Sequence, residues 1–241
     1  MKKRFFIVLM LATRISFSQK SEGETYAMYW LGYYITTQLH SKWSINTDIQ
    51  HRTKNGYKIQ AQSLIRSSLA YKINGSIQLS TGLAHFRHFI TNQLNRGEWR
   101  PWQEVSATQD HDKLKFINKL RVEQRFNQTV YQDALTNNYV FNWRFRYRFE
   151  MELDLFKQRT HMHSFNVGNE FMINAARSIG NPFDQNRSYV SYNYKLTDNI
   201  KLQLQYMYII QYIASRTNYD HVSVIRFNLY HTINNEHSSN K

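Results

Sequence analysis

The chain has 241 residues, enough for one domain, and its 31 Lys and Arg outnumber its 17 Asp and Glu, giving a formal net charge of +14. The absence of cysteine excludes a disulfide framework and thiol catalysis. No apolar run approaches the roughly 20 residues that a membrane-spanning helix needs. Aromatic residues make up 15%, which together with only two prolines and eight glycines is typical of a chain made mostly of β-strands.

Residues 1–18 have the pattern of a Sec signal peptide. Residues 1–4 carry three basic side chains, residues 5–12 form a short apolar core, and Ser16 and Ser18 are small residues suited to cleavage before Gln19. A buried N-terminal strand or helix is the alternative, but it leaves the basic side chains unexplained. Cleavage near Ser18 would remove four positive charges and leave a mature chain with a net charge of about +10.

The mature chain begins with four segments in which apolar and polar residues alternate with a period of two, as they do in strands. These segments are residues 29–39, 43–52, 59–71 and 77–83. In the first, Leu31 belongs to the apolar face and Trp30 to the opposite face. Tight turns are predicted at residues 40–42, at Asn55-Gly56 and at Asn74-Gly75, because Asn-Gly is a strong hairpin signal.

The middle of the chain is predicted to alternate between loops and strands. Residues 86–102 are strongly basic and irregular, so we interpret them as a loop that leads into a strand at residues 103–108. After a turn at residues 110–112, residues 114–125 alternate again and form the next predicted strand. Residues 127–138 are predicted to be a second loop.

Residues 139–155 show the clearest alternation. Every odd-numbered position is apolar or aromatic, and most even-numbered positions are charged, among them Arg144, Arg146 and Arg148. A helix would spread these arginines around its axis, so the segment is predicted to be a strand. At about 3.3 Å per residue it would run about 56 Å if unbroken, far beyond a usual strand. One apolar and one charged face over this length favour a barrel wall between lipid and a wet lumen.

The rest of the chain continues the pattern. The further predicted strands are residues 164–172, 190–196, 200–212 and 221–233. Residues 174–187 are predicted to be the longest external loop, residues 215–218 a shorter one, and Thr197-Asp198-Asn199 a tight turn.

The fold class that follows is all-β: a transmembrane antiparallel up-and-down β-barrel, made by residues 19–241 as a single outer-membrane domain after the signal peptide. Eleven segments alternate clearly, but bacterial single-chain barrels are usually even-numbered. We therefore expect about 12 strands, with 10 as the alternative. Short connections are expected at the periplasmic end and longer ones outside.

Short motifs occur in order along nearly the whole mature chain. They are Trp30-Leu31-Gly32-Tyr33-Tyr34, Lys42-Trp43-Ser44-Ile45, Arg52, Arg100-Pro101-Trp102-Gln103, Arg121-Val122-Glu123-Gln124-Arg125, Arg144-Phe145-Arg146-Tyr147-Arg148, Asn169-Glu170-Phe171 and Gln185-Asn186-Arg187. With the signal peptide, this set resembles the uncharacterised outer-membrane barrel family filed as domain of unknown function twenty-four-ninety. The resemblance implies an envelope barrel of unknown activity and supplies no catalytic residues. Unlike outer-membrane proteins in general, the chain does not stop at an aromatic residue on its last strand.

Charged residues on the predicted inward faces form the strongest candidate site. They are Arg52, Arg66, Arg121, Glu123, Arg125, Arg144, Arg146, Arg148, Glu150, Glu152, Glu170 and Arg187. We favour an interpretation in which arginines and glutamates of neighbouring strands pair and fill a small barrel. The alternative is a narrow, anion-preferring, porin-like channel, because guanidinium groups bind phosphate and carboxylate in bidentate geometry.

Histidines give weaker signals. His163 and Ser164 are neighbours on a strand and point to opposite faces, so they cannot form the base and nucleophile of a barrel lipid hydrolase, and a partner for His161 is undefined. His85 and His88 lack the carboxylate spacing of a metal site. We therefore predict no enzyme activity, catalytic residue, metal or cofactor, and a barrel lipid hydrolase remains the second alternative function.

The expected function is a structural or binding barrel of the cell envelope with a polar lumen filled by Arg and Glu. Its expected partners are outer-membrane lipids, with the basic residues 85–100 facing lipopolysaccharide phosphates or forming a solvated charge run, and a small anionic solute in the channel alternative. Nucleic-acid binding is not expected, because the aromatic face of each strand is continuous with the barrel wall.

Overall fold

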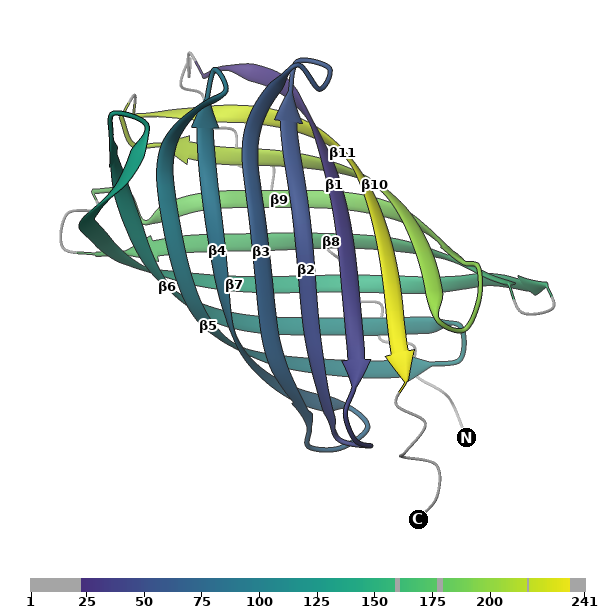
Figure 1. Cartoon of the computed structure of the whole chain (residues 1–241). Helices are drawn as coiled ribbons and strands as arrows, with labels where there is room; N and C mark the ends of the chain where they lie inside the picture. The colour runs from purple at the N-terminus through teal and green to yellow at the C-terminus, as the bar shows by residue number, and fades with distance from the viewer. Residues whose placement is uncertain (1–22, 159–160, 177–179, 216, 235–241) are drawn as a thin grey trace.

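A computed structural model describes residues 23–158, 161–176, 180–215 and 217–234, so the predicted signal peptide lies outside the described residues (Figure 1). The described chain folds into one closed barrel. Its strands are β1 (Thr25–Gln38), β2 (Trp43–Lys54), β3 (Ile59–Lys72), β4 (Ile77–Ile90), β5 (Gln93–His111), β6 (Leu114–Tyr131), β7 (Ala134–Gln158), β8 (His161–Ala175), β9 (Phe183–Lys195), β10 (Ile200–Ile213) and β11 (Asn218–Asn234).

Eleven strands, rather than twelve or ten, close the barrel in the described part of the chain. Each strand is antiparallel to its sequence neighbours, but β1 and β11 are parallel, from Thr25 opposite His221 to Gln38 opposite Asn234. This is a geometric necessity, because the first and last strands of an odd-numbered up-and-down series run in the same direction. The expectations of an even count and of wholly antiparallel pairing are therefore wrong, although each alternating segment of the sequence does form one strand.

Two predicted loops are largely strand. Most of residues 86–102 belongs to β4 and β5, which are joined at Thr91 and Asn92, and most of residues 127–138 belongs to β6 and β7, joined at Gln132 and Asp133. All four turn residues have positive φ, between 49° and 67°. Such two-residue turns match the twist of the strands, and their usual sequence signal is a glycine, as in Asn-Gly or Asp-Gly. Neither pair contains glycine, so this hairpin signal is absent from the sequence at both turns.

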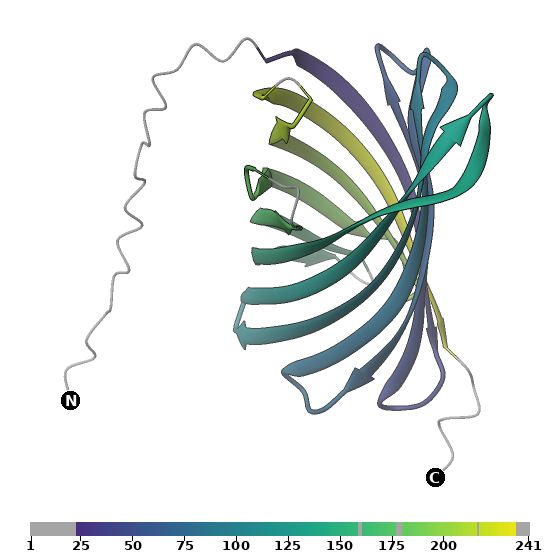
Figure 2. The same cartoon turned by 90° about the vertical axis from the view of Figure 1, so that its left-hand side faces the viewer.

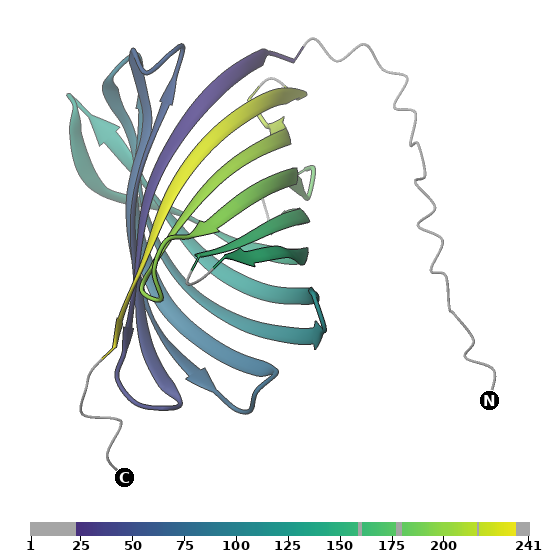
Figure 3. The same cartoon turned by 90° about the vertical axis from the view of Figure 1, so that its right-hand side faces the viewer.

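The connections are short at both ends of the barrel, so the expected contrast between short turns and long loops is not seen in the described residues. The predicted loop 174–187 is too long, because β8 extends to Ala175 and β9 begins at Phe183. Length is added in the strands instead: β7 has 25 residues, and its hairpin with β6 projects beyond the neighbouring strands (Figures 2 and 3).

The two faces of the wall differ as the alternation predicts. Outward side chains are mainly apolar and exposed, for example Leu120 (62%) and Phe227 (52%). Inward positions carry most of the buried polar and charged groups. The interior also contains a small apolar cluster, made of Trp30, Tyr189, Met207, Ile209, Val222 and Val224. No helix in the described residues is long and apolar enough to cross a membrane. The fold therefore has a polar core and an apolar surface.

Candidate functional site

The twelve charged residues predicted from the sequence all lie inside the barrel. Eleven of them line one or both of two internal cavities, and Glu123 is buried between arginines. They come from β2, β3, β6, β7, β8 and β9. The strand-by-strand alternation thus placed each side chain on the correct face without knowledge of its neighbours.

Glu123 on β6 is the centre of this ionic core. Its side chain is 1% exposed and its carboxylate contacts four guanidinium groups. The closest N–O distances are 2.9 Å to Arg146, 3.1 Å to Arg100, 3.8 Å to Arg144 and 4.0 Å to Arg121. A buried carboxylate needs such partners, because an unpaired charge away from water is very costly.

Two further buried carboxylates repeat the arrangement. Glu170 on β8 is 2% exposed, and its oxygens lie 2.5 Å from Arg148, 3.2 Å from Arg187 and 3.5 Å from Arg146. Because Arg146 contacts both Glu123 and Glu170, the two centres form one continuous network across β6, β7 and β8.

Glu98 on β5 is the third centre and was missed by the sequence reasoning. It is fully buried and lies 2.6 Å from Arg100, 2.7 Å from Arg125, 3.3 Å from His88 and 4.0 Å from Arg96. Through Arg100 it joins the network around Glu123.

Further charged residues of the interior were also missed, because they lie in segments that were predicted to be loops or were not included in the predicted cluster. They are Arg96, Arg100, Glu104, Asp184, Asp48 and Arg226. The signal that could have found several of them is the even-numbered run Arg96, Glu98, Arg100, Trp102 and Glu104, which continues the period of two through β5. Most of residues 85–100 is therefore strand rather than loop, and Arg96 and Arg100 line an internal cavity.

The interior contains two cavities of different charge. The first has a volume of about 350 Å³ and is lined by ten arginines and Lys54, with no Asp or Glu among its described lining residues. We call it the cationic chamber. The second, about 380 Å³, is lined by both signs, including Glu104, Glu150, Glu152 and Lys119, and we call it the mixed chamber. The chambers share four arginines, Arg66, Arg148, Arg187 and Arg226.

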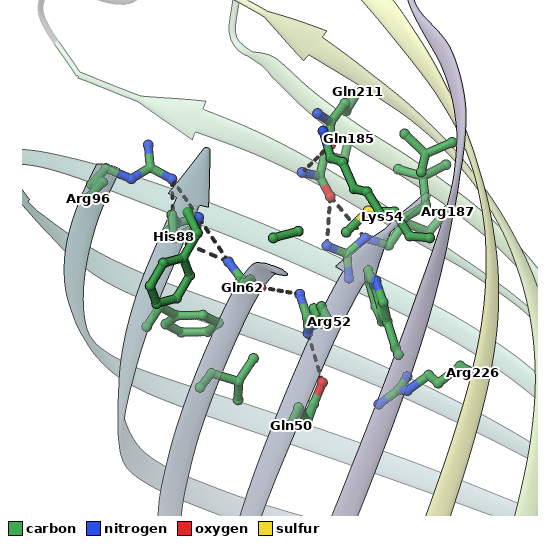
Figure 4. Close-up of a pocket in the computed structure, with 18 of the residues that line it drawn as sticks. Gln50, Arg52, Lys54, Gln62, His88, Arg96, Gln185, Arg187, Gln211 and Arg226 are labelled. Atoms are coloured by element: carbon green, nitrogen blue, oxygen red, sulfur yellow. Dashed lines mark hydrogen bonds between the residues drawn. The ribbon is translucent and has the colours of Figure 1, made fainter. Parts of the chain in front are cut away.

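Two arginines of the cationic chamber have only neutral partners. Arg52 donates to Gln62 at 2.5 Å and to Gln50 at 2.8 Å (Figure 4). Arg226 donates to Asn228 at 3.0 Å, to Gln205 at 3.2 Å and to the hydroxyl of Tyr34. Among the described residues, no carboxylate lies within ion-pair distance of either guanidinium. These arginines therefore contribute uncompensated positive charge.

The histidine and serine pair shows no catalytic geometry. The Oγ of Ser164 accepts a hydrogen bond from Asn193 inside the barrel, whereas His163 contacts Tyr192 on the outer face. No group of three or more His, Asp or Glu in the described residues is arranged to hold a metal ion. The chemistry that the described interior does offer is the binding of negative charge by fixed guanidinium groups.

The fold and its interior define a class: a closed β-barrel with an ionic core. Within that class, residues 27–220 match the family described as Protein of unknown function (DUF2490), and the chain belongs to this family. The match begins in β1 and ends in β11, so it covers nearly the whole barrel. No curated protein matches the chain.

Proposed function

We propose that this chain is an outer-membrane β-barrel whose interior is a filled ionic core, so that it serves as a structural or binding protein of the cell envelope. Strands of 12 to 25 residues support the membrane location, because a transmembrane β-strand needs only about 9–11 residues. The exposed apolar outer face and the signal-peptide pattern of residues 1–18 agree with it.

Burial of the three bridging carboxylates is the observation that carries the proposed filled core. Glu98, Glu123 and Glu170 are 0–2% exposed although they lie inside the barrel and carry charge. A continuous water-filled path beside them would expose them. Their arginine partners come from β5, β6, β7 and β9, which supports a core filled at that level.

Membrane fractionation tests the location. The full-length chain, expressed in a bacterium with an outer membrane, should lose its signal peptide near Ser18 and appear in the outer-membrane fraction. In detergent it should migrate differently on gels before and after heating, as stable barrels do. A processed chain that stays soluble and monomeric without heat-modifiable mobility contradicts the proposal.

Conductance in planar bilayers tests the filled core. We expect the wild type to be silent. The triple variant Arg100→Ala, Glu123→Ala and Arg146→Ala should conduct, because it removes three neighbouring long side chains together. Glu123 is included so that it does not remain buried after two of its arginine partners are removed. Thr47→Ala with Ser67→Ala, an exposed pair joined by a 3.1 Å contact, is the control and should stay silent.

Stable anion-selective conductance in the wild type would instead favour the channel alternative. Arg144→Ala with Arg146→Ala should then abolish that selectivity, because both arginines line the cationic chamber.

The lipid-hydrolase alternative has no support from the geometry of Ser164. Lipid hydrolysis by the wild type that disappears in Ser164→Ala would nevertheless overturn the expectation that the chain is not an enzyme.

A further inference from the structure

We propose that the cationic chamber is a binding site for the phosphoryl group of a small solute. This inference goes beyond the proposed envelope role, because it depends only on the described interior of the barrel and holds whether or not the barrel conducts.

Uncompensated charge around Trp30 is the first observation. The guanidinium carbon of Arg52 lies 3.8 Å from the centre of the indole ring, and those of Arg187 and Arg226 lie 5.6 and 5.7 Å from it. Of these three cations, only Arg187 has a carboxylate partner among the described residues, Glu170 at 3.2 Å. Like charges gathered around one ring repel one another, and a bound dianion would relieve that repulsion.

Unused hydrogen-bond donors are the second observation. Four arginines that line the chamber have a buried Nε–H without an acceptor in the described part of the chain: Arg52, Arg96, Arg144 and Arg146. A buried donor without a partner costs on the order of 1–3 kcal/mol, more for a charged group. These Nε–H groups have almost no accessible surface, so a ligand in the chamber meets the guanidinium groups of the same arginines, whose fork binds an oxyanion in bidentate geometry.

The shape and lining of the chamber favour a small phosphorylated solute. Its volume of about 350 Å³ lies near the lower limit of small-molecule sites, which span about 300–1,000 Å³. Trp30, Phe86 and Ile209 give apolar surface beside the arginines, and Figure 4 shows Gln62, Gln185 and Gln211 around the same space. A phosphate monoester supplies two negative charges for the two uncompensated arginines, Arg52 and Arg226, and an organic group that can contact the apolar wall. A carboxylate brings only one charge.

Calorimetric titration of the full chain in detergent at low salt tests this site. The probes are inorganic phosphate, phenyl phosphate and benzoate, and lipid A in vesicles distinguishes a lipid headgroup from a free solute. We expect saturable binding of phenyl phosphate, weaker binding of inorganic phosphate, and binding of benzoate weaker than that of phenyl phosphate by about tenfold or more.

The variant Arg52→Gln should weaken phenyl phosphate binding by about tenfold or more, because it removes one charge-assisted donor. Since Arg52 has only neutral partners, the change strands no carboxylate. The matched control is Lys201→Gln, which removes the same charge from the mixed chamber, where Lys201 lies over the ring of Tyr230. Its binding should stay within about twofold of the wild type. Arg226→Gln is the second variant if Arg52→Gln does not fold.

Several outcomes overturn the proposal. They are the absence of saturable binding by the wild type, equal affinity for benzoate and phenyl phosphate, and equal losses in Arg52→Gln and Lys201→Gln, which would mean that net charge alone attracts anions. Binding of lipid A vesicles without binding of phenyl phosphate would overturn the small solute as the ligand. None of these results bears on whether the chain inserts into the outer membrane, which fractionation decides separately.

Discussion

The cationic and mixed chambers occupy the same barrel, yet they differ in charge because single strands change sign along their length. The inward face of β7 carries Arg144, Arg146 and Arg148 on one stretch and Glu150 and Glu152 on the next. The arginines line the cationic chamber and the glutamates the mixed chamber, with Arg148 at both. The comparison teaches that alternation across the wall decides which residues are inside, whereas order along the strand decides what each half of the interior can bind.

The second difference is between single carboxylates and lies in how tightly they are paired. Glu123, buried between arginines, and Glu170, which also lines the mixed chamber, have three or more close cations each. Glu152, at the mixed chamber, has one cation among the described residues, Lys115 at 3.9 Å, and Lys115 is 38% exposed. Substitutions of tightly and loosely paired carboxylates should therefore have very different consequences.

Glu123→Ala should produce the largest effect. It leaves Arg100, Arg144 and Arg146 buried without their shared counter-charge, and removing one partner of a buried ion pair costs about 3–5 kcal/mol. The urea midpoint of unfolding in detergent measures the loss. An unchanged midpoint would show that water already reaches this centre.

Two arginine substitutions separate paired from unpaired charge. Arg144→Gln removes the ion-pair partner of the buried Asp184, 2.7 Å away, and leaves that carboxylate the hydrogen bond from Asn174 at 2.9 Å, so it should destabilise the barrel by about 1.5–3 kcal/mol. Arg52→Gln removes an arginine that has only neutral partners, so its cost should be under about 1 kcal/mol. Equal losses in the same denaturation assay would contradict the distinction between the two sites.

Phosphate binding should appear as added stability. At about ten times its dissociation constant, phenyl phosphate should raise the free energy of unfolding by about 1.4 kcal/mol, because only the folded barrel has the site. With the tenfold weaker binding expected of Arg52→Gln, the effect should fall to about 0.4 kcal/mol or less in that variant, and it should persist in Lys201→Gln. Equal stabilisation of both variants would locate the bound anion outside the cationic chamber.

Glu152→Gln should produce the smallest effect. Its Lys115 contact is long and partly solvated, so the expected loss is under about 1 kcal/mol, and the amide oxygen of the new glutamine can still accept the 3.2 Å hydrogen bond that Asn166 donates to Glu152. A loss as large as that of Glu123→Ala would show that the mixed chamber is as tightly coupled as the ionic core.

Strands were predicted correctly from the sequence where the alternation is unbroken. The prediction failed where a turn without glycine and a shift in strand register occur together. Around β4 and β5 the turn at Thr91 and Asn92 contains no glycine, and a register shift at His88 and Phe89 interrupts the period. Together they hid the end of β4 and the start of β5 in a segment that resembled a basic loop, and with them Glu98, the most buried of the described carboxylates. A bulge changes which face a residue occupies, and local composition does not reveal it.

The sequence by itself determined that this protein is built from long strands with one apolar and one charged face, and that the twelve arginines and glutamates named from its alternating segments point inward, because side-chain direction in an unbroken strand follows the period of two. Only the tertiary structure decided that eleven strands close with a parallel β1–β11 pair, which arginines surround each carboxylate, and that the interior divides into a cationic and a mixed chamber. Those features depend on the register of strands and on contacts across the closed barrel, which join residues far apart in the chain.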